Sequence, residues 1–144
     1  MDTIDANILD LLSKDSKPTL KALADKVGLS PSPLQARIKK LEKEGYIRGY
    51  VAQLDYTKIG QDHIAFVQVT LSDTRAEALT TFNDAVRTLK SVEQCHMIAG
   101  NFDYLLKVRT RNIRTYRIEL AERISSLPHV ASTSTFVSME TVCE

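Results

Sequence analysis

The chain has 144 residues, of which 43% are hydrophobic and 26% charged, and its formal net charge is only +1. This length allows two small domains but excludes two large ones. No apolar run approaches a membrane span, and the acidic start Met1-Asp2-Thr3 is not that of a signal peptide. Two distant cysteines, Cys95 and Cys143, indicate no disulfide framework. We therefore expect a cytoplasmic, fully folded protein with reduced thiols and no membrane partner.

The first expected element is an amphipathic helix near the N-terminus. Its apolar residues share one face: Ile4, Ile8, Leu11 and Leu12. Asp2 and Asp5 lie at its beginning, where the helix dipole favours negative charge. We expect this helix to pack across the next two and to complete a three-helix core.

The second helix is defined by local signals at both ends. Apolar residues repeat at i, i+3, i+4 and i+7 in Leu20, Leu23, Ala24 and Val27. Thr19, which follows Pro18, is a suitable N-cap, and Gly28 suits the left-handed position that ends a helix. The sequence therefore predicts a short helix between them.

A third helix follows after a tight turn. Ser30 can cap it, Pro31 can occupy its first position, and Gly45 should end it. Its inward face is predicted at i, i+4 and i+7, at Leu34, Ile38 and Leu41. Two short helices in this arrangement are typical of a helix-turn-helix, whose second helix enters the major groove of DNA.

Charge supports a DNA-binding role for this region. From Lys14 to Tyr50 there are nine basic and four acidic residues, a net +5 in a nearly neutral chain. We expect Gln35 and Arg37 to contact base edges and most of the other residues to contact phosphate. The expected DNA-binding residues are Lys17, Thr19, Ser30, Ser32, Pro33, Gln35, Ala36, Arg37, Lys39, Lys40 and Lys43. The alternative is a solvated helix face with pairs such as Lys40–Glu44.

After Gly45 the sequence YIRGYVAQLD is rich in β-forming residues and predicts a strand that leaves the DNA-binding domain. Tyr56 to Gly60 reads as a short connector. We expect a DNA-binding domain over residues 1–50, a strand and linker over 51–60, and a second domain over 61–144.

The second half predicts an α+β domain of β-α-β-β-α-β order, which is the ferredoxin-like arrangement. Asn112 can cap its second helix and Pro128 can end it. The expected strands are His63–Leu71, Val92–Ala99, Asp103–Thr110 and Val130–Met139, and the expected helices are Thr74–Leu89 and Ile113–Leu127.

Apolar residues on both faces of this sheet indicate a second subunit. In the first strand Ala65 and Val67 lie on one face and Ile64 and Phe66 on the other. Two helices cover one face only, so a partner copy should cover the other. A dimer would present the third helix of each subunit to DNA, with the two helices about one DNA turn, roughly 34 Å, apart. The alternative is scattered surface hydrophobic residues, which are normal.

The chain resembles the leucine-responsive protein/AsnC (feast/famine) family of transcriptional regulators. The matching stretches are MDTIDANILDLL, ALADKVGLSPSPLQARIKKLEKEGYI and IAGNFDYLLKV, in order over essentially the whole chain. The resemblance implies a winged-type helix-turn-helix head and a ferredoxin-like regulatory domain. It also implies double-stranded DNA as a partner, association with the nucleoid, homodimers that assemble further, often into octamers, and an amino acid as effector.

The resemblance also implies an effector site at a contact between dimers, around the turn Gly100-Asn101-Phe102-Asp103. Backbone N–H groups of a turn can hold a carboxylate, and Asp103 can pair with an α-ammonium group. The implied effector-binding residues are Met97, Ala99, Gly100, Asn101, Phe102, Asp103, Ile113, Thr135, Phe136 and Val137. The alternative is a plain β-hairpin turn, in which Gly-Asn is ordinary.

Two other functional classes fit the sequence less well. Some haem-biosynthesis decarboxylases resemble the family in fold, but His63, His96 and His129 are isolated and the basic helix is intact. A metal sensor would need Cys95 and His96 together, yet adjacent strand residues point to opposite faces. We expect no catalytic residues, no bound metal and no cofactor other than the effector.

Overall fold

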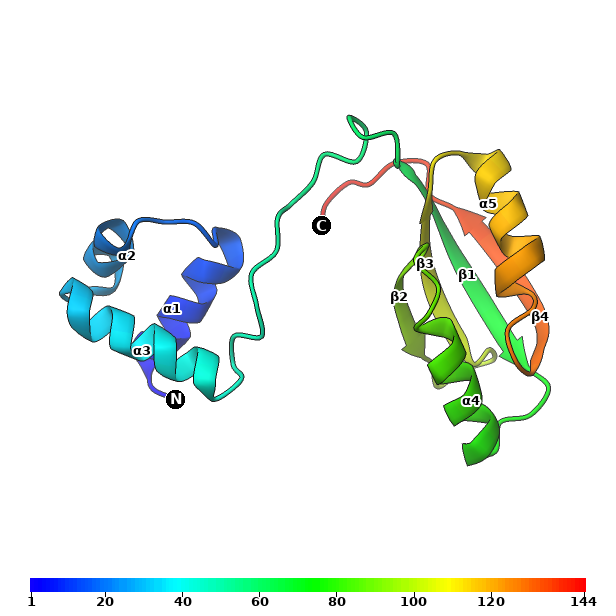
Figure 1. Ribbon diagram of the computed structural model, residues 1–144, viewed down its shortest axis with the longest axis horizontal. Helices are drawn as coiled ribbons and strands as arrows, with labels where there is room; N and C mark the ends of the chain where they lie inside the picture. Colours follow the sequence, from blue (N-terminus) through cyan, green and yellow to red (C-terminus); the bar gives the residue numbers. More distant parts are fainter. The chain divides into compact units, whose positions relative to one another are not determined.

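A computed structural model describes all 144 residues. The chain forms two compact units, Met1–Leu54 (unit 1) and Asp55–Glu144 (unit 2). The division falls within the segment expected to be a linker. The α+β fold class is confirmed, with a helical unit 1 and a unit 2 that contains a four-stranded sheet (Figure 1). None of the helices is long and apolar enough to cross a membrane.

Unit 1 contains the three expected helices: α1 (Thr3–Lys14), α2 (Leu20–Val27) and α3 (Pro31–Lys43). Its core consists of buried side chains from all three helices: Ile8, Leu23, Ala24, Leu34 and Leu41. Asp2 caps α1 by accepting a hydrogen bond from the Asp5 N–H at 2.8 Å. Thr19 caps α2 in the same way through the Ala22 N–H at 3.1 Å. The predicted Thr19 cap is therefore confirmed, and Asp2, expected only to favour the helix dipole, also caps α1.

The turn between α2 and α3 depends on Gly28, which adopts the left-handed conformation at φ 74°. Ser30 precedes α3, but its side chain makes no capping hydrogen bond. Pro31 is the first residue of α3, where its missing N–H leaves no hydrogen bond unmade.

The prediction of a strand over YIRGYVAQLD is wrong. Residues 46–55 form turns and extended chain, with no strand in unit 1. A strand needs a partner for its N–H and C=O groups, and the chain offers none beside this segment. Ile47 packs against the core of unit 1, whereas Val51 is 85% and Leu54 53% exposed.

Unit 2 has the predicted β-α-β-β-α-β order. Its strands are β1 (His63–Leu71), β2 (Val92–Met97), β3 (Tyr104–Thr110) and β4 (Val130–Val137), in the sheet order β2-β3-β1-β4. Every neighbouring pair is antiparallel. The helices α4 (Ala76–Val86) and α5 (Ile113–Glu119) lie on the same side of the sheet (Figure 1).

The core of unit 2 lies between this sheet face and the two helices. Alternate residues of β1 and β3, such as Val67 and Leu106, are fully buried. Phe82 of α4 stacks on Tyr104 of β3, with ring centroids 4.3 Å apart. On the opposite face Phe66 and Phe136 are paired across β1 and β4 and remain 37% and 55% exposed.

Several boundaries in unit 2 are shorter than expected. The helix predicted over Thr74–Leu89 covers only Ala76–Val86, and the strands end at Met97 and Val137. The predicted helix Ile113–Leu127 changes at Leu120 into a π-helical turn, η1 (Leu120–Ile124). The Ser125 N–H reaches back five residues to the Leu120 carbonyl at 2.9 Å. This wider turn keeps Ile124 in the core, and the sequence period gives no sign of it.

Candidate DNA-binding and effector sites

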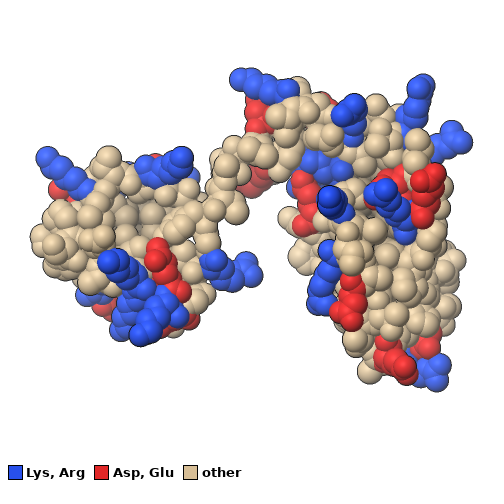
Figure 2. Space-filling view, viewed as in Figure 1, with Lys and Arg blue, Asp and Glu red and all other residues tan.

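The outer face of α3 is open to solvent because buried Leu34 and Leu41 fix its inner face. With the exception of Arg37, all the residues expected to bind DNA are exposed. Figure 2 shows Lys and Arg side chains gathered on the side of unit 1 where α3 lies. The surface therefore combines hydroxyl, amide and basic groups that can meet base edges and phosphates.

The basic side chains of this face are available for an external anion. Lys17, Lys39 and Lys43 form no ion pair, and Lys40 lies 4.0 Å from Glu44, at the outer limit of one. Such a solvent-exposed pair holds the ammonium group only weakly. Lys40–Glu44, which the solvated-face alternative invoked, is thus too loose to neutralise α3.

Arg37 is placed differently from the expectation. Its guanidinium donates to the Asp2 carboxylate at 2.7 Å and to the Asp5 carboxylate at 2.9 Å, so it ties α3 to the N-terminus of α1. Only 32% of its side chain is exposed. The Arg37 hydrogen bond is the largest cause of a lowered pKa at Asp2, and the two carboxylates raise the pKa of Arg37. Its expected base contact therefore competes with an existing ion pair.

Asp103, at the end of the turn between β2 and β3, makes hydrogen bonds through both its backbone and its side chain. The Ile98 N–H donates to the Asp103 carbonyl at 2.8 Å, and the Asp103 N–H donates to Val69 at 2.9 Å. The Asp103 carboxylate also accepts a hydrogen bond from the Leu71 N–H at 2.7 Å. Asp103 thus fixes the loop to β1, and only its remaining lone pairs can reach an α-ammonium group.

Asn101 and Gly100 are the exposed part of this turn. A Cβ at Gly100 would meet Ile98 at 3.6 Å, an ordinary contact, so the folded chain itself does not require glycine there.

The implied effector-binding residues do not form one pocket within a single chain. In the sheet register, Tyr104 after the turn lies opposite Val69, whereas Phe136 lies opposite Phe66. Thr135 and Phe136, as neighbours on a strand, also point to opposite faces. Thr135 faces α5 and bonds the Tyr116 hydroxyl, so it is part of the internal packing. Within one chain, the turn and the β4 residues are therefore not brought together.

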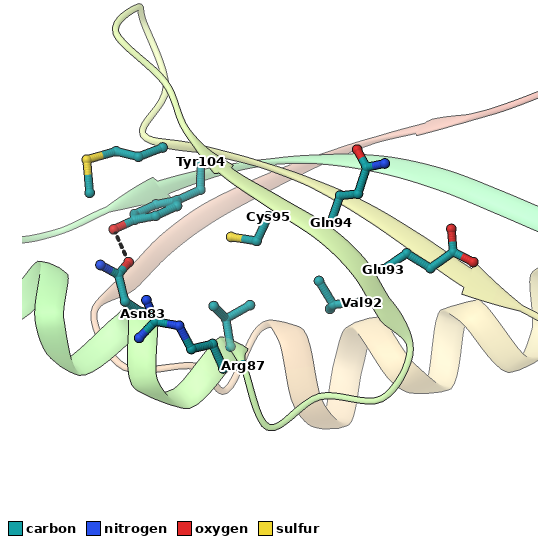
Figure 3. A pocket seen from close by; sticks show the side chains of 9 residues that line it. Asn83, Arg87, Val92, Glu93, Gln94, Cys95 and Tyr104 are labelled. Atoms are coloured by element: carbon teal, nitrogen blue, oxygen red, sulfur yellow. Dashed lines mark hydrogen bonds between the residues drawn. The ribbon is translucent and has the colours of Figure 1, made fainter. Parts of the chain in front are cut away.

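Met97 belongs to a different hollow, which lies between α4 and β2 (Figure 3). Asn83 accepts a hydrogen bond from the Tyr104 hydroxyl at 2.5 Å, and Arg87 and Cys95 line the same hollow. The sequence did not reveal it because α4 and β2 meet only in the fold. Burial raises the pKa of the Cys95 thiol, so this cysteine is not an activated nucleophile.

No group of three or more His, Cys, Asp and Glu side chains is placed to hold a metal ion. Of the three histidines, His63 lies under α5, with its Nδ1 3.2 Å from the Thr110 hydroxyl, and His96 lies beside Gln94.

Comparison with known proteins agrees with this division of the chain. The profile of a winged helix-turn-helix DNA-binding domain matches residues 1–48, and that of the Lrp/AsnC ligand binding domain matches residues 64–144. A proline dehydrogenase transcriptional activator of Rhizobium radiobacter is 57% identical, over 100% of this chain and 92% of that protein.

Two solved structures share the fold over the whole chain. An AsnC family transcriptional regulator from Agrobacterium tumefaciens matches with a TM-score of 0.93 at 33% identity, covering 100% of this chain and 94% of that one. A transcriptional regulator from Neisseria meningitidis in complex with L-Met has a TM-score of 0.93 at 26% identity, covering 100% and 93%. These proteins are named as regulators, and none supports the tetrapyrrole decarboxylase alternative.

Proposed function

We propose that this chain, which belongs to the Lrp/AsnC family of DNA-binding transcriptional regulators and is not an enzyme, changes its binding to DNA when it binds an amino acid. The observation that carries the DNA-binding part of the proposal is the exposed outer face of α3, where Gln35 and three exposed lysines lie on a helix anchored by buried leucines. Unit 1 reads DNA, and unit 2 binds the effector and a second copy. Such a regulator acts at the chromosome, so we place it in the cytoplasm with the nucleoid.

In this proposal the N-terminal half of α3 lies in the major groove. Gln35 reads a base edge, for which adenine offers the matching donor and acceptor. Ser32, Pro33 and Ala36 contact the groove beside it, and the lysines hold the phosphates that set the register. Arg37 stays ion-paired with Asp2 and Asp5, and so links α3 to α1, unless a group on DNA binds its guanidinium more strongly.

Paired substitutions on α3 test this reading. Gln35→Ala should reduce discrimination between the operator and a mutated site, by about 1–3 kcal/mol for a bidentate contact. Lys40→Ala on the same helix should weaken binding to both sequences equally and lower the salt dependence. Fluorescence anisotropy with both duplexes gives the two affinities. Equal weakening of both sequences by Gln35→Ala would refute its role as a base reader.

The effector is proposed to be an amino acid held at the Gly100–Asp103 turn by a pair of chains. Exposed N–H groups of the turn suit its carboxylate, and β4 of a second chain supplies Phe136. The Neisseria meningitidis relative with L-Met supports an amino acid as the ligand class. The Rhizobium radiobacter relative is named a proline dehydrogenase transcriptional activator, so we propose a proline-catabolism gene as target and L-proline as the first candidate effector.

A second copy is proposed to cover the open face of the sheet. Phe66 and Phe136 form an adjacent aromatic pair on it, and Leu105 of β3 lies on the same face. Burying this surface in a homodimer removes apolar area from water, and dimers then assemble further, to an octamer or another multimer. Analytical ultracentrifugation of Phe66→Ser with Phe136→Ser, against the unaltered chain, tests this directly. An unchanged mass would refute the proposed dimer face.

Thermal unfolding with each of the twenty amino acids tests the effector proposal. A ligand that binds only the folded protein stabilises it by about 2.7 kcal/mol at a hundredfold excess over its Kd. The shift should vanish in Asn101→Ala, whose side chain makes no contact that holds the fold together. Asp103→Ala is a poorer probe, because it also removes the bond to Leu71. No shift with any amino acid would refute the ligand class.

A further inference from the structure

The basic residues of unit 2 differ in whether they have a partner. Between Asp55 and Glu144 there are 10 basic and 11 acidic residues, so the unit has no basic excess. Half of the basic residues are paired: Arg75 with Asp73, Arg87 with Asp84, Lys107 and Arg109 with Glu93, and Arg123 with Glu119. The others form no ion pair, and they are Lys58, Lys90, Arg111, Arg114 and Arg117.

Four of these unpaired cations gather around α5, and we call them the α5 basic surface: Lys90, Arg111, Arg114 and Arg117. Lys90 and Arg111 line one hollow, and Arg114 and Arg117 line a second hollow on another face of the same helix. All four side chains are exposed. Figure 2 shows Lys and Arg side chains over the part of unit 2 where α5 lies.

The carboxylates near this surface do not neutralise it. Glu119 is only 12% exposed and is engaged by the Ser91 hydroxyl at 2.7 Å and by Arg123 at 3.5 Å. Glu122 lines the second hollow together with Arg114 and Arg117 but forms no ion pair with either. Arg114 and Arg117 are three residues apart on a helix, so their like charges repel each other. This arrangement costs stability in the free chain and indicates an external anion.

We propose that the α5 basic surface is a second DNA-binding surface, which contacts the sugar-phosphate backbone outside the groove read by α3. Guanidinium groups suit phosphate because they donate two parallel hydrogen bonds. DNA held by unit 1 is present near unit 2 at high effective concentration, so even weak contacts add to the affinity. These contacts are independent of sequence. The proposal rests on the DNA binding of the family and on no assumption about the effector.

The test compares two charge-matched variants of the full-length protein. R111Q/R114Q/R117Q removes three unpaired cations around α5, and the control K58Q/R75Q/R87Q removes three cations elsewhere in unit 2. Binding is measured by anisotropy at several salt concentrations, on a random-sequence duplex several helical turns long. The proposal predicts weaker binding for the first variant, and a slope of log K against log salt reduced by roughly 0.9 for each phosphate that the variant no longer neutralises. The control should change neither quantity by as much.

A third variant separates DNA contact from a role in assembly. R111K/R114K/R117K keeps the charge but not the planar guanidinium, so it should restore most of the affinity and salt slope. Equal affinity and slope for R111Q/R114Q/R117Q and the control would overturn the proposal and point to an acidic protein partner. Loss of the native oligomer in R111Q/R114Q/R117Q, not restored by the lysine variant, would also overturn it and assign the surface to a subunit contact. If Gln35→Ala failed as a base reader, this proposal would still stand.

Discussion

The two units are stabilised by different kinds of contact. Unit 1 has five buried apolar side chains and depends on caps, tight turns and the Arg37 ion pairs between α1 and α3. Unit 2 has a larger core, in which strands far apart in sequence pair and two helices cover one face of the sheet. We conclude that the DNA-binding unit is specified by local sequence, whereas the regulatory unit depends on long-range packing.

The units also hold their charges differently. On α3 Lys39 and Lys43 are unpaired and Lys40 lies 4.0 Å from Glu44, while Arg37 is engaged by two carboxylates. Around α5 three arginines, Arg111, Arg114 and Arg117, are unpaired, and the carboxylate of Glu119 is engaged by Arg123 and Ser91. The unit with the large core therefore carries the freer guanidinium groups, and this contrast motivates the proposed second DNA-binding surface.

The largest expected effect is in the core of unit 2. Phe82→Ala removes a fully buried ring that stacks on Tyr104 and should destabilise unit 2 by about 3–5 kcal/mol. Denaturant unfolding, followed separately in each unit by NMR, should show an earlier transition in unit 2 alone. Leu34→Ala is the converse control and should affect unit 1. Equal loss in both units from either variant would contradict their independence.

Asp103→Ala distinguishes a structural role of the Asp103 side chain from a role in ligand binding. The Leu71 N–H loses its acceptor in a half-buried position, so unit 2 should lose about 1–3 kcal/mol without any effector present. Asn101→Ala, two residues away and exposed, should leave stability unchanged. Chemical denaturation of both variants measures this. If both were equally stable, the Asp103 carboxylate would have no structural role.

Helix capping in unit 1 offers a matched pair of substitutions. Thr19→Ala removes an observed cap of α2 and should cost about 0.5–2 kcal/mol. Ser30 precedes α3, but its side chain makes no capping hydrogen bond, so Ser30→Ala should change the free energy of unfolding by close to zero. Thermal unfolding distinguishes the two. A larger loss for Ser30 would show that local caps do not define this unit as we describe.

The smallest expected effect concerns pH and the ion pairs of Arg37. Arg37 lowers the pKa of Asp2 below 3.8. The Asp2–Arg37 ion pair therefore contributes fully to folding stability above pH 3.8, and this contribution is lost as pH falls through the lowered pKa. Substituting Arg37→Met should return the Asp2 pKa toward 3.8. An NMR titration of the Asp2 carboxyl carbon measures it. An unchanged pKa in the variant would mean that Arg37 and Asp2 do not interact in solution.

The sequence predicted most where signals are local. Thr19, Gly28 and Pro31 define the helices of unit 1, and each lies where the sequence placed it. The strand expected after Gly45 failed because β-propensity states a preference and supplies no partner. The π-helical turn at Leu120 was equally invisible, since the four-residue spacing of Tyr116, Leu120 and Ile124 fits an α-helix as well as a single π turn.

For the candidate sites, the sequence predicted which individual residues are exposed but not which residues contact one another. Exposure of the α3 face follows from the positions of Leu34 and Leu41, which the helical period gives. The engagement of Arg37 does not, because Asp2 and Asp5 lie more than thirty residues away. The effector residues likewise came from resemblance, and their separation to two ends of the sheet emerges only from the strand register.

The most direct test of the central claim is the affinity of the chain for promoter DNA, with and without each amino acid, starting with L-proline. An effector can shift DNA binding only by its difference in affinity for the free and DNA-bound states. We predict that at least one amino acid changes the Kd for DNA, and that Asn101→Ala abolishes the change while leaving binding without effector intact. A Kd that is the same with all twenty amino acids would contradict the account.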